Sequence, residues 1–301
     1  MYHFLMPGFL GPMDRFNRQF RKPIEKAADT DRMRQLQKRI KPFLLRRSKQ
    51  SVAQELPEKT EIIRSVILDG KQRDLYESIR LAMDIKVREE INKKGLARSH
   101  IMILDALLKL RQVCCDPALV SLDKAKKVKQ SAKMELLMEM LPEMIEEGRK
   151  ILIFSQFTKM LAIIETAIKQ KHITYSKLTG QTRKRDEAIE FFQNGPADIM
   201  LISLKAGGVG LNLTAADTVI HYDPWWNPAV ENQATDRAHR IGQDKSVFVY
   251  KLISENTVED KIIALQRKKL LLADSVYGGD GKAQQGPLLS AEDLEDLLKP
   301  M

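Results

Sequence analysis

The chain has 301 residues, of which 43% are hydrophobic and 30% are charged, and this composition suits one large or two modest packed domains. No apolar run approaches the roughly 18 residues that a membrane span needs. The first residues also lack the basic and apolar segments of a signal peptide. We therefore expect an intracellular protein that makes no contact with a membrane.

Positive charge is concentrated in the first part of the chain. The net charge is +10, and residues 1–130 alone contain 29 Lys and Arg against 16 Asp and Glu. Such a basic segment favours a polyanionic partner, because Lys and Arg gain affinity by displacing counterions from phosphates. A solvated helical surface has the same composition. Charge alone favours nucleic acid only slightly.

The chain contains only two cysteines, Cys114 and Cys115, and they are adjacent. Neighbouring cysteines rarely form a disulfide with each other, and two thiols without a nearby histidine do not complete a zinc site. The five histidines are scattered along the chain. We expect reduced cysteines packed in a helix, and no metal site built from these residues.

Apolar residues at spacings of three and four predict helices in the first part of the chain. The first of these helices, at residues 31–47, is interrupted by Pro42. Partial alternation predicts a short strand at 56–68. Helices follow at 71–94 and 101–115, and Asp116 and Pro117 end the second of them. The polar, lysine-rich residues 121–133 are a candidate linker.

From about residue 131 the pattern changes to short apolar runs that alternate with helical segments. Strands are expected at 151–154, 173–178, 198–202, 218–222 and 247–252. Helices are expected at 157–170, 185–192, 228–239 and 257–272. This alternation predicts an α/β fold with a doubly wound parallel sheet. A short acidic helix capped by Ser290 is expected near the C-terminus.

The strongest motif is QATDRAHRIGQ at residues 233–243. In a helix, Gln233, Arg237 and Arg240 would project from one face, because they stand at positions i, i+4 and i+7. Two guanidiniums and an amide form a good clamp for a triphosphate, since arginine donates to the oxygens where transition-state charge develops. A surface network of ion pairs is equally compatible with this spacing.

Several polar residues lie where predicted strands end or predicted helices begin. Backbone N–H groups and hydroxyls at such positions commonly contact phosphates. The candidates for nucleic-acid contact on this ground are Ser155, Gln156, Thr179, Gly180 and Arg185. The turn KAGGVGLN at 205–212 could either approach phosphate closely or simply join a strand to a helix. The segment DPWWNP at 223–228 predicts a loop with two tryptophans.

These motifs, in this order, resemble those of Swi/Snf-type remodelling ATPases of helicase superfamily two. QATDRAHRIGQ resembles motif six, ILIFSQFTKML (151–161) motif four, and residues 201–234 motif five with its extension. Upstream, residues 43–61 resemble the segment that joins the two motor lobes, and residues 104–120 resemble the helix that ends the protrusion of the second lobe. The resemblance covers nearly the whole chain. One departure is Asp116, where the family usually has histidine.

The resemblance implies a RecA-like sheet with a helical protrusion and a C-terminal brace helix. Residues 1–130 would contain the end of the first lobe, the linker and the basic protrusion. Residues 131–256 would form the second motor lobe, and residues 257–301 the brace helix and tail.

The resemblance also implies roles for individual residues. Arg237 and Arg240 would act on ATP as catalytic arginine fingers, with Gln233, Gly210 and Asn212 near the nucleotide. Ser203 and Lys205 would lie nearer to DNA. Trp225 or Trp226 would couple the two lobes or contact DNA.

The sequence contains no G-x-x-x-x-G-K-[ST] phosphate loop. DEAI at 186–189 imitates an acidic magnesium box but lacks the preceding buried strand. The family places both motifs in a first lobe of the same chain, which would bind most of the ATP and Mg²⁺. The expected partners are duplex DNA, that first lobe and a DNA-bound protein. The expected location is the cytoplasm or nucleoid of a prokaryote, or the nucleus of a eukaryote.

Two other interpretations remain open. A strand-separating helicase would need a wedge element, for which the sequence offers no candidate. A scaffold that has lost ATPase activity would have no need of Gln233, Arg237 and Arg240.

Overall fold

The computed structural model of the chain describes residues 5–27, 29–43, 56–68, 70–95, 98–206, 210–277 and 297. They belong to two compact units. One is formed by Met1–Gln54 with Arg267–Leu294, and the other by Glu55–Gln266 with Glu295–Met301. The units do not follow the predicted boundaries at 130 and 256. The reason is that residues 59–67 form a strand of the same sheet as the later α/β elements.

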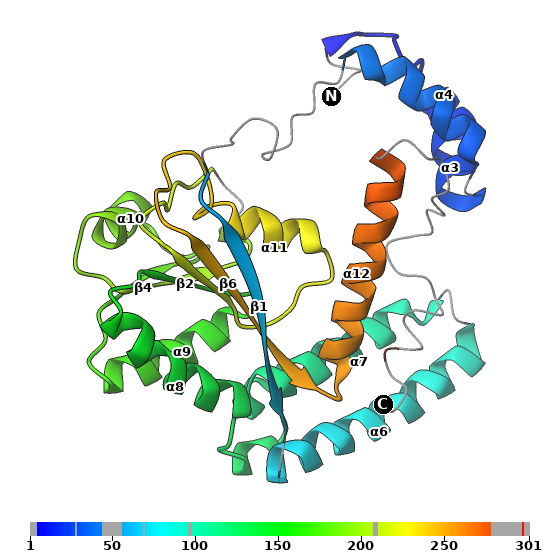
Figure 1. Cartoon of the computed structure of the whole chain (residues 1–301). Helices are drawn as coiled ribbons and strands as arrows, with labels where there is room; N and C mark the ends of the chain where they lie inside the picture. The colour runs from blue at the N-terminus through cyan, green and yellow to red at the C-terminus, as the bar shows by residue number, and fades with distance from the viewer. Residues whose placement is uncertain are drawn as a thin grey trace. The chain divides into compact units, whose positions relative to one another are not determined.

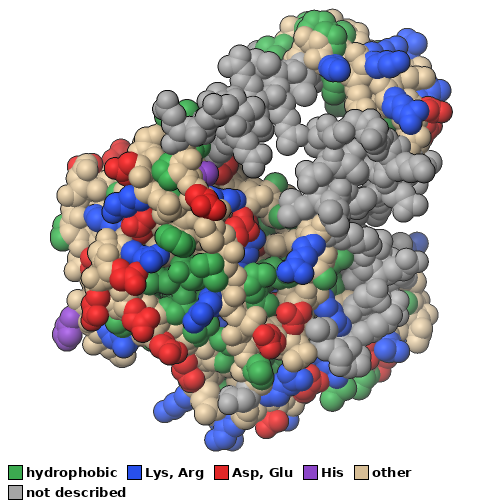
Figure 2. Space-filling model, in the orientation of Figure 1, with side chains coloured by type: hydrophobic (Ala, Val, Ile, Leu, Met, Phe, Trp, Pro, Cys, Tyr) green, Lys and Arg blue, Asp and Glu red, His purple; other side chains and the backbone are tan. Residues whose placement is uncertain are grey.

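The N-terminal part of the first unit contains short helices: α2 (Met13–Phe16), the π-helix η1 (Asn17–Arg21), α3 (Lys22–Ala27), α4 (Thr30–Ile40) and the 3-10 helix η2 (Lys41–Phe43). The carboxylate of Asp29 caps α4 by accepting from the backbone N–H of Arg32 at 2.9 Å. The α-helix ends before Pro42, as predicted. Figure 2 shows lysine and arginine side chains gathered on the helices of this unit, which agrees with the basic composition of residues 1–130.

The second unit contains six parallel strands in the order β1-β6-β5-β2-β4-β3. Their bounds are β1 (Lys59–Ile67), β2 (Ile151–Ser155), β3 (Tyr175–Leu178), β4 (Ile199–Ser203), β5 (Thr218–His221) and β6 (Val247–Glu255). β2, β4 and β5 are buried throughout. This explains why each of them is an uninterrupted apolar run in the sequence, since both faces of the strand are covered.

Helices cover both faces of the sheet (Figure 1). On one face, Ile151 and Ile153 pack in a cluster with α8 (Ala132–Glu146) and α9 (Thr158–Gln170). On the other face, Leu152 and Phe154 pack in a cluster with α10 (Arg185–Gln193) and α11 (Pro228–Thr235). Alternate residues of one strand thus serve two cores. The predicted doubly wound parallel sheet is confirmed.

A pair of long helices, α6 (Gly70–Lys94) and α7 (His100–Cys115), lies between β1 and α8 in the chain. As predicted, α7 ends at Asp116, whose carboxylate accepts from the N–H of Ala118 at 2.8 Å. Two 3-10 turns follow, η4 (Pro117–Leu119) and η5 (Ala125–Lys127), and η5 lies in the segment predicted as a linker. The two cysteines of α7 are buried and free, as expected.

One predicted helix is shorter in the structure. The helix expected at 228–239 ends at Thr235 and is followed by turns. The carbonyl of Arg237 accepts from the N–H of Leu213 at 3.0 Å, and the carbonyl of Ala238 accepts from the Gln243 side chain at 3.1 Å. The backbone N–H groups of Arg237 and Ala238 donate to the carbonyls of Ala234 and Thr235, three residues earlier, at 3.1 and 3.0 Å, so the chain tightens into turns after Thr235. Gln233, Arg237 and Arg240 therefore do not form one helical stripe.

The last helix, α12 (Val258–Tyr277), begins near the predicted start and continues beyond the predicted end at 272. The helix predicted to begin at Ser290 lies outside the described residues, apart from Leu297. Among the helices that the structure describes, none combines the length and apolar character of a membrane span.

Candidate functional site

Polar residues predicted at strand ends lie along one edge of the sheet, because all six strands are parallel. Ser155, the last residue of β2, pairs directly with Ser203, the last residue of β4. Thr179 follows β3, which pairs with β4, and Asp223 follows β5, which pairs with β2. In open α/β sheets, ligands bind outside this carboxyl edge. Residues from separate motifs are thus brought to the edge where binding sites form.

Asp223 is fully buried at the centre of this edge. Its carboxylate accepts from the hydroxyl of Ser155 at 2.5 Å and from the backbone N–H of Gln156 at 3.3 Å. Burial raises the pKa of Asp223, and this rise is opposed by the guanidinium of Arg111 and the hydrogen bond from Ser155. The Ser155 side chain is thereby directed inward, so its predicted contact with nucleic acid would have to come from the backbone.

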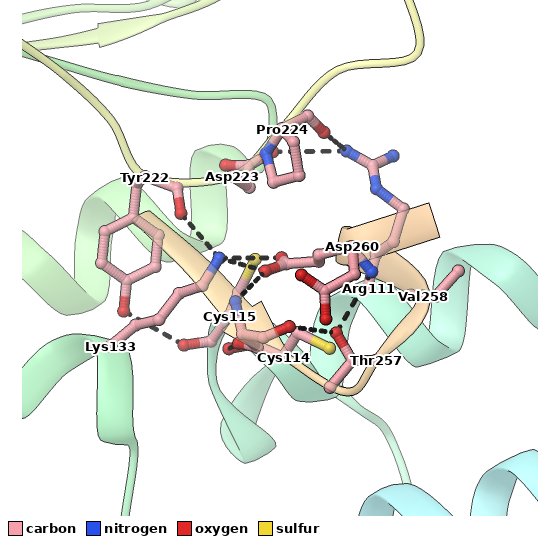
Figure 3. Close-up of polar contacts among 12 residues, drawn as sticks. Arg111, Cys114, Cys115, Lys133, Tyr222, Asp223, Pro224, Thr257, Val258 and Asp260 are labelled. Carbon is pink, nitrogen blue, oxygen red and sulfur yellow. Dashed lines mark hydrogen bonds and ion pairs between the residues drawn. The ribbon is translucent and has the colours of Figure 1, made fainter. Parts of the chain in front are cut away.

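Arg111 of α7 holds the loop that follows β5. Its side chain is 2% exposed and lies 3.5 Å from the carboxylate of Asp223. One terminal nitrogen donates to the carbonyl of Pro224 at 2.6 Å, and the other donates to Oε1 of Gln156 at 3.0 Å. Figure 3 shows this guanidinium directed at Asp223 and Pro224.

The guanidinium also lies near the faces of three aromatic rings. Its distances to the ring centroids are 5.1 Å for Trp226, 5.5 Å for Trp225 and 5.7 Å for Phe157. Residues 223–226 are called the tryptophan loop below. A cation between aromatic faces gains electrostatic attraction and packing together, so Arg111 joins the helical pair to this loop.

A second buried charge pair lies below the same loop. Lys133, at the start of α8, lies 2.6 Å from the carboxylate of Glu259 in α12, and both side chains are 0% exposed. The ammonium of Lys133 also donates to the carbonyl of Tyr222 at 3.0 Å, as Figure 3 shows. The hydroxyl of Tyr222 donates in turn to the carbonyl of Cys115 at 3.1 Å. Helices α7, α8 and α12 thus meet beneath the end of β5.

A glutamate of α11 also contacts the tryptophan loop. Glu231 of α11 is 1% exposed and accepts from the backbone N–H of Trp225 at 2.6 Å. The amide of Gln266 in α12 donates to the same carboxylate oxygen at 2.8 Å and to the carbonyl of Trp225. Lys251 of β6 lies 3.4 Å from the other oxygen of Glu231.

The turns after α11 pack on the loop that leads from β4 to β5. We call residues 236–243 the arginine turn. Arg240 donates from a terminal nitrogen to the carbonyl of Leu211 at 3.3 Å. The side-chain amide of Gln243 donates to the carbonyls of Thr214 and Ala216 at 3.0 and 2.8 Å. The arginine turn and the β4–β5 loop, which belong to different sequence motifs, are therefore packed against each other.

The two predicted catalytic arginines differ in exposure. Arg240 is exposed, whereas Arg237 is 9% exposed. The Nε atom of Arg237 is buried and has no hydrogen-bond acceptor. No acidic side chain among the described residues lies within ion-pair distance of it. An unpaired buried guanidinium is unfavourable unless something compensates it.

The other predicted residues line the same edge or the adjoining loop. Arg185 begins α10 and donates to the carbonyl of Ala206 at 3.3 Å, in the loop after β4. Thr179 is buried, and its hydroxyl accepts from the backbone N–H of Gln181 at 3.3 Å. The remaining predicted residues are exposed: Gly180, Lys205, Gly210, Asn212 and Gln233. Gly210 has a φ of +31°, which favours glycine.

Sequence reasoning missed the residues that organise this edge, namely Arg111, Lys133, Asp223, Glu231 and Glu259. A signal for Arg111 was present in the sequence, because it lies among buried apolar positions of α7 such as Leu107 and Cys114. Arginine on the buried face of a helix requires a partner. The partner, Asp223, is too distant in sequence for the pattern to reveal it.

The described residues contain no group of three or more His, Cys, Asp or Glu side chains arranged to hold a metal ion.

Two family models match the chain. The model of the helicase conserved C-terminal domain matches residues 132–242, and the model of the SNF2-related domain matches residues 1–119. The first match covers β2 to β5, α11 and nearly all of the arginine turn. The second includes β1, α6 and α7. Together the two models cover most of the structure described above.

Known proteins resemble the chain over most of its length. The human SWI/SNF-related matrix-associated actin-dependent regulator of chromatin subfamily A member 1 is 38% identical, and the match covers 99% of this chain and 29% of that protein. The SWI2/SNF2 ATPase core of Sulfolobus solfataricus in complex with dsDNA is 37% identical over 99% of this chain and 63% of that one, with a TM-score of 0.63.

The solved C-terminal domain of the Sulfolobus solfataricus SWI2/SNF2 ATPase is 35% identical, with a TM-score of 0.62. The match covers 81% of this chain and 100% of that one. The chain spans about a quarter to a third of the length of the curated relatives it matches. From its paired family models and its match to a complete solved domain, the chain belongs to the SWI2/SNF2 family of ATPases.

Proposed function

We propose that this chain is the C-terminal motor lobe of a DNA-dependent ATPase that moves along duplex DNA and remodels protein–DNA complexes. In this proposal the ATP site is completed by Arg237 and Arg240. The phosphate loop and the acidic magnesium box would belong to a first lobe, since neither motif occurs in these 301 residues with its required context. Names of the matched relatives, which include ATP-dependent helicases, support this class of activity.

The observation that carries the proposal is the state of Arg237. Its guanidinium is nearly buried, has no acidic partner among the described side chains, and leaves Nε without an acceptor. Arg240, three residues later, is exposed and anchored to the carbonyl of Leu211. Donors held in this way fit the oxygens of a triphosphate, which would supply the negative charge that Arg237 lacks among the described side chains.

The chain's own part in the reaction would be electrostatic. Arg237 and Arg240 would donate N–H groups to phosphoryl oxygens and stabilise the charge that develops as the terminal phosphate departs. Mg²⁺, when bound, would neutralise charge on the same phosphates. Because hydrogen bonds to Leu211 and Leu213 fix the arginine turn on the β4–β5 loop, little reorganisation would be needed at that moment.

DNA would bind along the carboxyl edge of the sheet. The exposed candidates there, Gly180 and Lys205, and the half-buried Arg185 offer backbone N–H groups and cations suited to phosphates. The solved relative in complex with dsDNA supports duplex DNA as the partner. The basic composition of residues 1–130 supports a polyanion as well.

The decisive experiment is ATP hydrolysis by the full-length protein with and without duplex DNA. We expect hydrolysis that DNA stimulates, without strand separation. The 301-residue chain alone is expected to show no turnover. A full-length protein that binds DNA but hydrolyses no ATP in its presence would contradict the proposal, as would a 301-residue chain that hydrolyses ATP once contaminants are excluded.

A further inference from the structure

The tryptophan loop is held by buried polar groups from three helices. Arg111 of α7 bonds Pro224 at 2.6 Å, Glu231 of α11 accepts from Trp225 at 2.6 Å, and Gln266 of α12 donates to the carbonyl of Trp225. All three side chains are at most 3% exposed. A surface loop of this length does not need three buried polar anchors for stability alone, because each anchor must be desolvated.

Arg111 differs from the other two anchors because it also orients a side chain at the carboxyl edge. Its second terminal nitrogen donates to Oε1 of Gln156, and the amide nitrogen of Gln156 is buried without an acceptor. The Gln156 backbone N–H points to Asp223, which is the carboxylate that Arg111 faces. One guanidinium thus fixes a candidate DNA contact and the two tryptophans together.

We propose that Arg111 is the positioning residue through which DNA contact at the carboxyl edge accelerates ATP hydrolysis. It holds Gln156 and the tryptophan loop in one arrangement, and Glu231 joins that loop to α11, from which the arginine turn follows. The chain of contacts therefore runs from α7 and Gln156 through the loop to the helix that leads into Arg237. This inference rests on the proposed function.

The chemistry of arginine is essential to this role. Two donors in a fixed plane reach Gln156 and Pro224 while the face of the plane lies against indole rings. Lysine can keep the charge opposite Asp223, but it has neither the planar fork nor the stacking surface. Arg111→Lys is therefore the informative change, because the buried ion pair with Asp223 can persist.

The experiment has an enzymatic readout in the full-length protein. Arg111→Lys should lower the DNA-stimulated kcat on the order of ten- to a hundredfold, the cost of misplacing a positioned group. The rate without DNA and the KM for ATP should stay unchanged. Gln156→Leu should give a similar loss, and the double variant should lose no more than the larger single one, since both act through one contact.

A spectroscopic readout uses the 301-residue chain, whose only tryptophans are Trp225 and Trp226. Arg111→Lys should shift their emission to longer wavelength and increase quenching by acrylamide, with the melting temperature nearly unchanged. The matched control is Arg80→Lys in α6, because Arg80 is also buried and is paired with Glu77 at 2.8 Å. It should change neither emission nor stimulated kcat.

The outcomes separate the two proposals. DNA-stimulated hydrolysis that is equal in the wild type and Arg111→Lys would overturn the positioning role while leaving the proposed function intact. A wild type without any DNA-stimulated hydrolysis would overturn the proposed function itself. A lower melting temperature with unchanged emission and an unchanged rate per folded molecule would reduce Arg111 to a structural residue and so contradict the inference.

Discussion

Two buried arginines of the α/β unit lie in contrasting surroundings. Arg111 faces the carboxylate of Asp223, and both of its terminal nitrogens have acceptors, although its Nε has none. Arg237 is almost as buried, yet no described carboxylate approaches it. A charge that is matched within the protein supports the structure. A charge that is left unmatched in a folded domain is suited to a ligand. Arg111 therefore represents the residues that stabilise the structure of the site, and Arg237 the residues that would contact bound ATP.

The buried pair Lys133–Glu259 tests whether a matched buried charge supports the structure, and it is expected to give the largest change in the free energy of unfolding. Lys133→Met or Glu259→Leu should each lower the free energy of unfolding by about 3–5 kcal/mol, because the remaining charge is buried without its partner. The double replacement should recover most of this loss. Urea unfolding of the α/β unit measures both.

The control for that experiment is the exposed pair Lys126–Asp123, whose side chains are 74% and 94% exposed. Lys126→Met should change the free energy of unfolding by less than about 1 kcal/mol. If the Lys133→Met chain were as stable as the wild type, the buried ion pair would make no contribution to the free energy of unfolding.

Arg237 and Arg240 test the second half of the comparison. In the full-length enzyme, alanine at either position should lower the DNA-stimulated kcat by at least about 100-fold, or about 2.7 kcal/mol, through loss of transition-state charge stabilisation. Lysine should rescue little, because it lacks the planar pair of donors. The affinity for DNA and the melting temperature should barely change.

Arg149→Ala is the matched control for these variants. Arg149 pairs with Glu147 at 2.6 Å just before β2 begins, and hence at the amino edge of the sheet. It should leave kcat unchanged. Folded Arg237→Ala and Arg240→Ala enzymes with near-normal kcat would remove both residues from the proposed site and make the unpaired guanidinium a structural feature only.

His221 extends the comparison to a buried group that is kept uncharged. Burial lowers its pKa to about 3, with Lys251 contributing in the same direction. The unfolded chain takes up the proton near pH 6.5 but the folded chain does not, so stability is lost as the pH falls below 6.5. The expected loss between pH 6.5 and pH 5 is about 1.6 kcal/mol.

Urea unfolding of His221→Gln at the two pH values measures this contribution. The variant should lose less stability than the wild type on acidification. His172→Asn is the control at an exposed position with a φ of 59°, which asparagine tolerates. Equal acid sensitivity of wild type and His221→Gln would contradict the assignment.

The smallest effect concerns the two thiols. Burial raises the pKa of both Cys114 and Cys115, so neither forms a reactive thiolate in the folded chain. Ellman's reagent at pH 8 should label them only when the chain unfolds, whereas an added Ser246→Cys at an exposed position should react at once. Rapid labelling of the native wild-type chain would show that the core around α7 opens readily.

Some elements of the fold could be predicted from the sequence and others could not. The strands β2, β4 and β5 were predictable, because burial on both faces demands a continuous apolar run. The end of α11 was not, since the N–H groups of Arg237 and Ala238 switch to the carbonyls three residues earlier while the carbonyl of Arg237 accepts from Leu213. The spacing of residues continues through residue 239 and does not reveal this change from helix to turns.

The residues of the candidate site likewise fall into those that the sequence predicts and those that it does not. Residues at strand ends, such as Ser155 and Thr179, were predictable from the pattern of strands and helices alone. Motif likeness pointed to Arg237 and Arg240, whose roles remain predictions. The buried anchors were not predictable. Arg111 finds Asp223 across more than a hundred residues of chain, and no pattern in a single sequence encodes that pairing.

The edge strand β1 has a consequence for how the protein is made. Residues 59–67 of β1 pair with residues 247–255 of β6. The first strand of the chain therefore cannot join the sheet until the last strand has been synthesised. During synthesis, β1 leaves the ribosome long before β6, its neighbour among the described strands, and contacts between such distant segments form slowly. Until then, the exposed backbone edge of β1 is open to pairing with other chains. Completion of the sheet is therefore expected to be a late step of folding, and the nascent chain is most vulnerable to aggregation just before it.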